Sequence, residues 1–141
     1  YECTVGSLFA APIRMILAQP RNPDFLANDL RLVLFSQNIT EEQLEEWDER
    51  FSAPLLQHYG MTETVGEPLA NPLDYTRDNM TIGMATLGYE CRVVDEEGND
   101  VALGTPGELL VSGKPGWTIT KGYFKNPEAT AAVNPEAPNA V

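Results

Sequence analysis

The stretch LRLVLFSQNITEEQLEEWDERFSAPLLQHY, residues 30–59, decides the fold. It begins with an apolar run at 30–35 and ends with another at 54–59, and both runs are typical of short β-strands. Between them, Thr40 and Gln43 have the spacing of a capping box, which predicts that a helix begins there. A strand, a helix and a strand in this order predict a βαβ unit, whose strands are parallel and joined by a right-handed crossover.

The helix that follows Thr40 has two chemically different faces. Leu44, Trp47 and Phe51 recur at helical spacing and should form its buried stripe. The acidic residues of this helix should face solvent, and they are Glu41, Glu42, Glu45, Glu46 and Glu49. We therefore interpret this run of negative charge as a hydrated helix face rather than as a binding site.

The flanking sequence contains further helix and strand patterns. Apolar residues at helical spacing predict a helix over about 11–18, and they are Leu8, Phe9, Ile13, Ile16 and Leu17. A hairpin turn is expected at 96–100 and a strand at 108–112. Pro127 is placed to open a last helical turn at 126–130.

The expected fold class is α/β, with a βαβ unit of a parallel sheet followed by a β-rich meander. After residue 64 helical periodicity disappears and Gly and Pro become frequent, so the meander should cover about 82–125. We expect an α/β part at about 1–68, a β-rich part at about 80–125 and a truncated tail at 126–141.

Two strand ends nominate a binding site. In parallel sheets, ligands bind beyond the carboxyl ends of the strands. The first strand delivers Ser36, Gln37 and Asn38 to that edge, and the second delivers Tyr59 to Glu63. We therefore expect these two segments to be neighbours.

The segment from Gln57 to Glu63 combines side chains that suit a nucleotide. The ring of Tyr59 can stack on a base, and Gly60 allows the backbone to approach a ligand. The hydroxyl of Thr62 can donate to a phosphate oxygen, and the carboxylate of Glu63 can hold a hard cation such as Mg²⁺. The same residues would also suit a polar turn that binds nothing.

Composition excludes several classes of function. Nine Lys and Arg against 21 Asp and Glu give a net charge of −12, which disfavours nucleic acid and anionic membranes as partners. Backbone N–H groups can still bind an anionic nucleotide locally. The two cysteines form no close-spaced motif and the apolar runs are too short to span a bilayer, so we expect a cytoplasmic protein. The chain begins at Tyr1 without an initiator Met, and we expect it to be a piece of a longer protein.

Two stretches of this chain resemble signatures of the adenylate-forming (AMP-binding) superfamily. The first is Tyr59-Gly-Met-Thr-Glu63. The second is Gly107-Glu-Leu-Leu-Val-Ser-Gly113 followed by Lys121-Gly-Tyr-Phe-Lys-Asn-Pro-Glu-Ala-Thr130, and the segment 114–124 is most similar to crotonobetaine/carnitine–CoA ligase-like enzymes. The resemblance implies an internal piece of the large N-terminal domain of an acyl-CoA synthetase.

The resemblance also implies roles for individual residues. Thr62 would contact the α-phosphate of ATP and Glu63 would bind Mg²⁺, so these two are the expected catalytic residues. Tyr59 would stack on adenine, with Gln57 beside the edge of the base. The whole expected nucleotide set is Ser36, Gln37, Asn38, Gln57, His58, Tyr59, Gly60, Met61 and Thr62.

The acyl group is expected on the other side of the same loop. Gly60 and Met61 would form the wall between adenylate and acyl group, and Gly83 would line the acyl pocket. Two departures change the expected contacts: Ser36-Gln37-Asn38 replaces a loop that is commonly small, and His58 replaces a residue that is commonly small. Gly107 and Glu108 are interpreted as structural.

The reaction that the resemblance implies has two halves: a carboxylate and ATP form an acyl-adenylate, and the thiol of CoA then displaces AMP. The expected partners are therefore ATP, Mg²⁺, CoA and a small carboxylic acid. The chain contains no Lys-bearing phosphate loop, no Asp for the ribose and no C-terminal catalytic Lys, so we expect it to be inactive alone. A non-catalytic, partner-binding α/β module and an adenylation domain that loads a carrier protein are the alternatives. Neither the acid nor the oligomeric state can be predicted.

Overall fold

The computed structural model describes residues 2–133, which belong to two compact units. The first unit comprises Tyr1–Tyr59 and Leu69–Met84, and the second comprises Gly60–Pro68 and Ala85–Val141. Among the helices of the described residues, none has the length and apolar character needed to cross a membrane.

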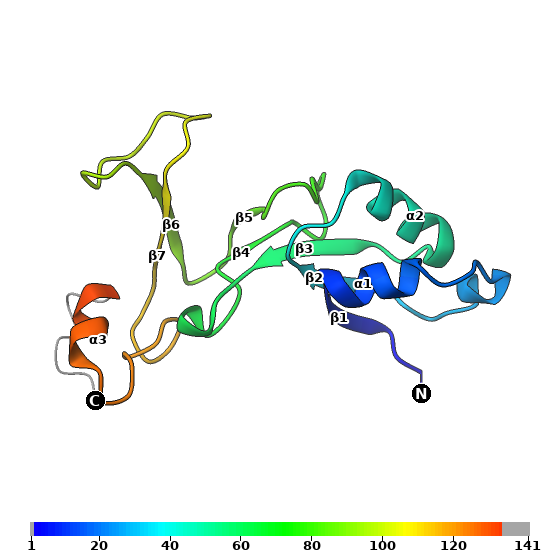
Figure 1. Cartoon of the computed structure of the whole chain (residues 1–141), viewed down its shortest axis with the longest axis horizontal. Helices are drawn as coiled ribbons and strands as arrows, with labels where there is room; N and C mark the ends of the chain where they lie inside the picture. Colours follow the sequence, from blue (N-terminus) through cyan, green and yellow to red (C-terminus); the bar gives the residue numbers. More distant parts are fainter. Residues whose placement is uncertain (1, 134–141) are drawn as a thin grey trace. The chain divides into compact units, whose positions relative to one another are not determined.

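The first unit is built on a sheet whose strand order is β1-β2-β3-β4-β5 (Figure 1). Its strands are β1 (Val5–Phe9), β2 (Leu32–Ser36), β3 (Leu55–Tyr59), β4 (Leu69–Ala70) and β5 (Met84–Ala85), where the chain passes into the second unit. β1, β2 and β3 are parallel, and β4 is antiparallel to β3. The parallel pairing of the two strands predicted at 30–35 and 54–59 is therefore confirmed.

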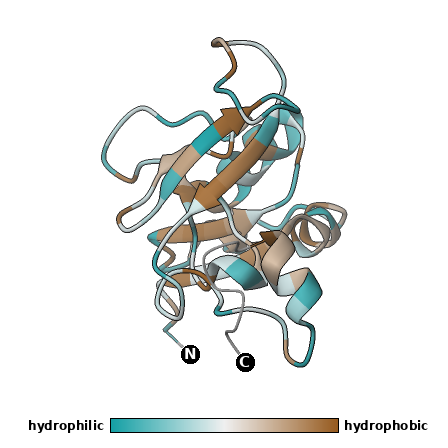
Figure 2. Cartoon of the chain, turned by 90° about the vertical axis from the view of Figure 1, so that its left-hand side faces the viewer, coloured by the Kyte–Doolittle hydropathy of each residue, from teal (hydrophilic) through white to brown (hydrophobic). Residues whose placement is uncertain are grey.

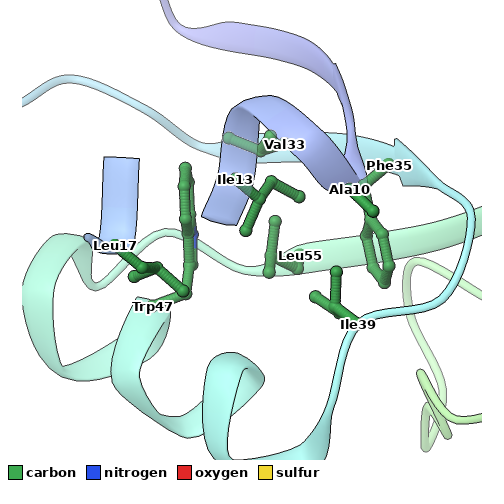
Figure 3. Packing of buried hydrophobic residues seen from close by; sticks show 8 residues of the cluster. All are labelled: Ala10, Ile13, Leu17, Val33, Phe35, Ile39, Trp47 and Leu55. Atoms are coloured by element: carbon green, nitrogen blue, oxygen red, sulfur yellow. The ribbon is translucent and has the colours of Figure 1, made fainter. Parts of the chain in front are cut away.

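Two helices connect the parallel strands and enclose the core between themselves and the sheet. They are α1 (Ala10–Leu17) between β1 and β2, and α2 (Glu41–Phe51) between β2 and β3. Figure 3 shows Ile13 of α1 and Trp47 of α2 pointing toward Val33, Phe35 and Leu55 of the strands. Two right-handed crossovers that advance in the same direction along a sheet place their helices on the same face.

Local sequence explains why α2 begins and ends where it does. The Thr40 hydroxyl accepts a hydrogen bond from the Gln43 amide at 3.3 Å, and the Thr40 amide donates to the Gln43 side chain at 3.0 Å. This is the predicted capping box, and Ser52 ends the helix in a left-handed conformation with φ 48°. Trp47 is buried and its indole N–H donates to the Ala53 carbonyl at 3.0 Å, so the predicted apolar stripe is also confirmed.

The acidic face of α2 is exposed except at Glu46. This carboxylate is partly buried and pairs with the guanidinium of the buried Arg50 at 2.5 Å. A second arginine, Arg21, lies 2.9 Å from Glu49. The prediction that all five glutamates face solvent therefore fails at Glu46, because an arginine one helical turn away is buried beside it.

Leu8 and Phe9 lie in a strand and not on the helix that their spacing suggested. Val5 to Phe9 pair with β2 over five residues, and α1 begins only at Ala10. The strand depends on hydrogen bonds to a segment more than twenty residues away, and a local apolar pattern does not reveal such pairing. The helix predicted over about 11–18 is otherwise confirmed.

The second unit contains an antiparallel strand pair and short helices. β6 (Glu90–Val94) pairs with β7 (Glu108–Ser112) over five residues, and a 3-10 turn, η2 (Thr62–Thr64), precedes them in the chain. The predicted turn is present, since the Asp95 carboxylate accepts hydrogen bonds from the amides of Glu97 and Asn99. Throughout the chain, brown hydrophobic residues gather in the strands while the loops are mostly pale or teal (Figure 2).

The C-terminal helix of the described residues is α3 (Pro127–Val133). Pro127 is its first residue, as predicted, because a proline has no amide hydrogen to leave unpaired at a helix start. The remainder of the predicted tail, 134–141, lies outside the described residues.

Candidate functional site

The ends of β2 and β3 bring together the predicted residues of the first unit. Phe35 lies opposite Gln57 in the parallel ladder, so Ser36 to Asn38 leave the sheet beside the end of β3. Gln57 is buried, and both of its backbone groups are bonded: its amide donates to Oδ1 of Asn79 at 3.0 Å, and its carbonyl accepts from the Asn71 amide at 2.9 Å. The sheet thus holds the end of β3 from both sides.

Gln37 has an unusual backbone conformation at the end of β2. Its φ is 73°, in the left-handed region that few residues other than glycine adopt. The next residue, Asn38, accepts a hydrogen bond from the Arg14 guanidinium through its carbonyl. Strained, tied-down residues of this kind cluster at binding sites.

In the second unit, the loop from Gly60 to Gly66 is held by its own hydrogen bonds. Thr64 is 2% exposed, and its hydroxyl donates to the Met61 carbonyl at 2.8 Å and accepts from the Met61 amide at 2.9 Å. The Tyr89 hydroxyl donates to the Thr64 carbonyl at 2.6 Å and accepts from the Gly66 amide at 3.1 Å. These contacts fix the backbone that carries Thr62 and Glu63.

Gly60 is required by the packing of this loop. A Cβ at this position would lie 2.8 Å from the Gly66 carbonyl oxygen, which is backbone and cannot move aside easily. Thr62, two residues later, is exposed, whereas Thr64 is buried and its hydroxyl bonds the loop. The loop therefore separates a structural threonine from one that a ligand can reach.

Glu63 carries a carboxylate that one tyrosine holds in place. Its Oε1 accepts a hydrogen bond from the Tyr123 hydroxyl at 2.8 Å, and its backbone carbonyl accepts from the Thr120 amide at 2.6 Å. The hydrogen bond from Tyr123 is the main reason that the pKa of Glu63 lies below its usual value, and the same bond raises the pKa of Tyr123. The carboxylate is therefore ionised at neutral pH.

A cavity of about 350 Å³ adjoins this carboxylate within the second unit. Its wall includes Met61, Glu63 and Thr64 of the loop together with Ile119 and Tyr123. A second cavity, of about 490 Å³, is lined by residues around Tyr89 and Lys114 and by none of the predicted site residues. Of these two cavities, the one at Glu63 is lined by predicted site residues.

The donor set at Glu63 suits magnesium. Within residues 2–133, no three His, Cys, Asp or Glu side chains are grouped closely enough to hold a metal ion. A single carboxylate is still sufficient for Mg²⁺, which takes one or two carboxylates and completes its shell with water and phosphate oxygens. Glu63 therefore fits a cation that arrives with a phosphate-bearing ligand.

Gly83 has a backbone role that the sequence did not reveal. Its φ is +85°, and a Cβ there would lie 2.1 Å from the carbonyl carbon of Ala70. Close packing against β4 explains why glycine occupies this position in the first unit. That Gly83 also lines an acyl pocket stays a prediction.

The predicted site residues thus fall into two groups, which the Tyr59–Gly60 peptide bond joins. Sequence reasoning missed the residues that hold the second group, namely Thr64, Tyr89 and Tyr123. Tyr123 lies in the second signature stretch, and its occurrence in that stretch was the available signal. Its partner is 60 residues away in the chain, so spacing alone could not identify it.

Comparisons with known proteins identify the family of the chain. The family model described as AMP-binding enzyme matches residues 1–124. A crotonobetaine/carnitine–CoA ligase of Salmonella heidelberg (strain SL476) is 36% identical over 137 residues, which are 96% of this chain and 26% of that protein. The chain therefore spans about a quarter of the length of this curated relative.

Solved structures share the fold. ATP-bound MatB from Rhodopseudomonas palustris has a TM-score of 0.79 and 29% identity, with 92% of this chain and 25% of that chain covered. The anthranilate CoA ligase AuaEII in complex with anthranoyl-AMP has a TM-score of 0.80 at 23% identity, over 94% of this chain and 25% of that one, which is a likeness of fold alone. The expected fold class is confirmed.

Proposed function

Because the chain belongs to the AMP-binding enzyme family, we propose that it is part of an ATP-dependent acid–CoA ligase that forms an acyl-adenylate and transfers the acyl group to CoA. The observation that carries the proposal is the loop of the second unit, where an ionised, oriented Glu63 carboxylate stands next to the exposed Thr62. The family resemblance gives these same two residues the phosphate and metal contacts.

The first half-reaction joins two anions. A carboxylate oxygen of the substrate attacks the α-phosphorus of ATP, the bond to the pyrophosphate oxygen breaks, and an acyl-phosphate anhydride forms. Thr62 donates a hydrogen bond to an α-phosphate oxygen, and Tyr59 stacks on the adenine. Glu63 would hold Mg²⁺, which supplies positive charge to the phosphates when it is bound.

The second half-reaction consumes the acyl-adenylate. The sulfur of CoA attacks the acyl carbonyl carbon, the bond to the phosphate oxygen breaks, and AMP leaves. Gly60 and Met61 would separate the adenylate from the acyl group, and Gly83 would line the acyl pocket. The acid is a small carboxylic acid, in keeping with relatives named for crotonobetaine and carnitine.

The remaining nucleotide contacts belong to the first unit. Ser36, Gln37 and Asn38 would lie along the purine, with Gln57 and His58 near the base edge. A cytoplasmic location is part of the same proposal, supported by the two unpaired thiols, Cys3 and Cys91, which are usual in a reducing compartment.

The test uses the full-length protein that contains this chain. ATP–pyrophosphate exchange is measured against a panel of carboxylic acids, and at least one acid should support exchange that depends on Mg²⁺. Glu63→Gln should lower that exchange by about 10²–10³, the usual effect of removing one preorganised electrostatic group. Glu96→Gln, an exposed change in the β6 turn, is the matched control and should leave the rate unchanged.

Three outcomes separate the alternatives. Exchange that is equal in Glu63→Gln and wild type removes Glu63 from the mechanism. Absence of exchange with every acid, in a folded protein, would favour a non-catalytic partner-binding module. Acyl transfer to a carrier-protein thiol in preference to CoA would identify the enzyme as a carrier-loading adenylation domain.

A further inference from the structure

Glu63 is held by a residue that the proposed chemistry does not use. Its Oε1 accepts the Tyr123 hydroxyl hydrogen at 2.8 Å, and its carbonyl accepts the Thr120 amide at 2.6 Å. Both contacts come from one short segment, 120–123, which therefore hydrogen-bonds both the side chain and the backbone of Glu63. The carboxylate also accepts a hydrogen bond from the backbone amide of Glu63 itself, so Tyr123 is the contact that comes from outside the loop.

The position of Tyr123 is itself fixed by its surroundings. Its amide donates to the Thr130 hydroxyl at 2.9 Å, and that hydroxyl donates to the Asn126 carbonyl at 2.8 Å. Thr130 is 1% exposed, and it lies so close to Gly122 that a Cβ on Gly122 would be 2.4 Å from its Cγ2. The phenol is therefore presented by a tightly packed turn at the start of α3.

These contacts join the two signature stretches physically. Glu63 belongs to the first stretch, whereas Tyr123 and Thr130 belong to the second, and the interval between Glu63 and Tyr123 is 60 residues. The spacing from Gly122 to Thr130 within the second stretch has a physical reason in the Thr130 contacts. The three residues form a hydrogen-bonded relay: Thr130 holds the backbone of Tyr123, and the hydroxyl of Tyr123 holds the carboxylate of Glu63.

We propose that Tyr123 is a positioning residue for magnesium–ATP: its hydroxyl bonds Oε1 of Glu63 and so fixes the direction in which the carboxylate meets the cation. This inference rests on the proposed function, which supplies the ligand. Groups that hydrogen-bond a metal-binding carboxylate fix its direction, and their loss typically weakens metal affinity or activity by about 10–100-fold. Tyr123 touches neither nucleotide nor acid in this role.

The test compares ATP binding with and without Mg²⁺ in the full-length protein. Calorimetry gives the dissociation constant of ATP in each condition, and the ratio of the two isolates the part of the affinity that the metal contributes. In Tyr123→Phe this ratio should fall by about 10-fold, because the ring remains but the carboxylate is no longer directed. The Mg²⁺ concentration for half-maximal pyrophosphate exchange should rise by a similar factor.

Two tyrosine controls separate positioning from loop order. Tyr89→Phe removes a hydroxyl that holds the same loop at Thr64 and Gly66 but does not bond the Glu63 carboxylate, so it should lower the unfolding midpoint and reduce the binding ratio less than Tyr123→Phe does. Tyr75→Phe changes a tyrosine that is 78% exposed and should alter neither quantity. An equal loss of the ratio in Tyr89→Phe and Tyr123→Phe would overturn the positioning role.

The outcomes also distinguish this inference from the proposed function. If wild-type protein shows no Mg²⁺-dependent ATP binding, the proposed function fails. If wild type shows it and Tyr123→Phe retains the full ratio, only the inference fails. Should Tyr123→Phe not fold, Thr130→Val makes the same test, since it removes the hydroxyl that holds the Tyr123 amide, and an unchanged ratio there would overturn the relay.

Discussion

Gly83 and Gly98 have nearly the same backbone conformation in different surroundings. Their φ angles are +85° and +83°, but a Cβ on Gly83 would lie 2.1 Å from the Ala70 backbone, whereas nothing lies within 4 Å of one on Gly98. We predict that Gly98→Ala lowers the free energy of unfolding by about 1 kcal/mol, because alanine is strained in the left-handed backbone conformation. Gly83→Ala should cost about 3 kcal/mol or more, because the steric conflict with backbone is added.

Urea unfolding of the two alanine variants measures this difference. The two positions have the same backbone conformation, so the extra loss of unfolding free energy in Gly83→Ala measures the steric conflict with the Ala70 backbone. Equal losses of unfolding free energy in the two variants would mean that the backbone near Ala70 can shift at little cost. Close packing against Ala70 would then not explain the glycine at position 83.

For single residues, the sequence indicated which side chains are polar and exposed but not which hydrogen bonds they make. Thr62 is exposed and the pKa of Glu63 is lowered, chiefly by its hydrogen bond from Tyr123, while the phosphate and metal roles of the two residues stay predictions. Thr64 escaped notice because a threonine in a turn looks the same whether its hydroxyl faces solvent or the loop. Tyr123 escaped because a hydrogen bond over 60 residues depends on the whole path of the chain between them.

The helix α2 depends on its capping box. Thr40→Ala should destabilise the chain by about 1 kcal/mol, since the Gln43 amide loses its side-chain acceptor. The Thr40 hydroxyl is also the main reason that the pKa of Glu42 is lowered. That pKa should therefore rise toward its ordinary value in Thr40→Ala.

A lowered carboxyl pKa stabilises the fold above the unfolded-state pKa, and this stabilisation disappears as the pH falls through the folded-state pKa. The difference in unfolding midpoint between wild type and Thr40→Ala should accordingly narrow in acid. Thr105→Ala, at an exposed turn, is the control. A difference that stays constant from neutral pH to below the pKa of Glu42 would show that Glu42 does not contribute.

Elements were predictable where their signals are local. α2 carries its own cap and its own apolar stripe, so its sequence alone specifies its start and its buried face. β1 carries five residues with exposed and half-buried positions in alternation, and its main partner is β2. Its apolar residues continue the period of α1, so the helical pattern did not reveal that Val5–Phe9 form a strand.

The 141-residue chain contains only some of the parts that an adenylate-forming reaction needs. It spans 26% of a curated relative and carries no phosphate loop with lysine and no catalytic lysine domain. We predict that the chain alone forms no acyl-CoA and binds ATP far more weakly than the full-length protein does. Turnover assays and calorimetry on both proteins test this, and robust acyl-CoA formation by the chain would contradict it.

The fold class and half of the site could be read from the sequence of the whole chain. The parallel strands placed Ser36 to Asn38 beside Gln57 to Tyr59, because the geometry of a βαβ unit is nearly invariant. The loop from Gly60 to Glu63 belongs to the second unit, whose strand pairing and turns depend on many separate contacts. No single pattern in the sequence encodes that set.

The bond between Glu63 and Tyr123 has a consequence for biosynthesis. A ribosome adds about 5–20 residues per second, so the glutamate leaves the peptidyl transferase centre roughly 3–12 s before the tyrosine that will orient it. During that interval the nascent polypeptide contains all three of its parallel strands, yet the Glu63 carboxylate lacks its Tyr123 partner. The Glu63 carboxylate therefore acquires its hydrogen bond from Tyr123 only late in synthesis, and a polypeptide that stops short of Tyr123 has the parallel strands but not the hydroxyl that holds this carboxylate.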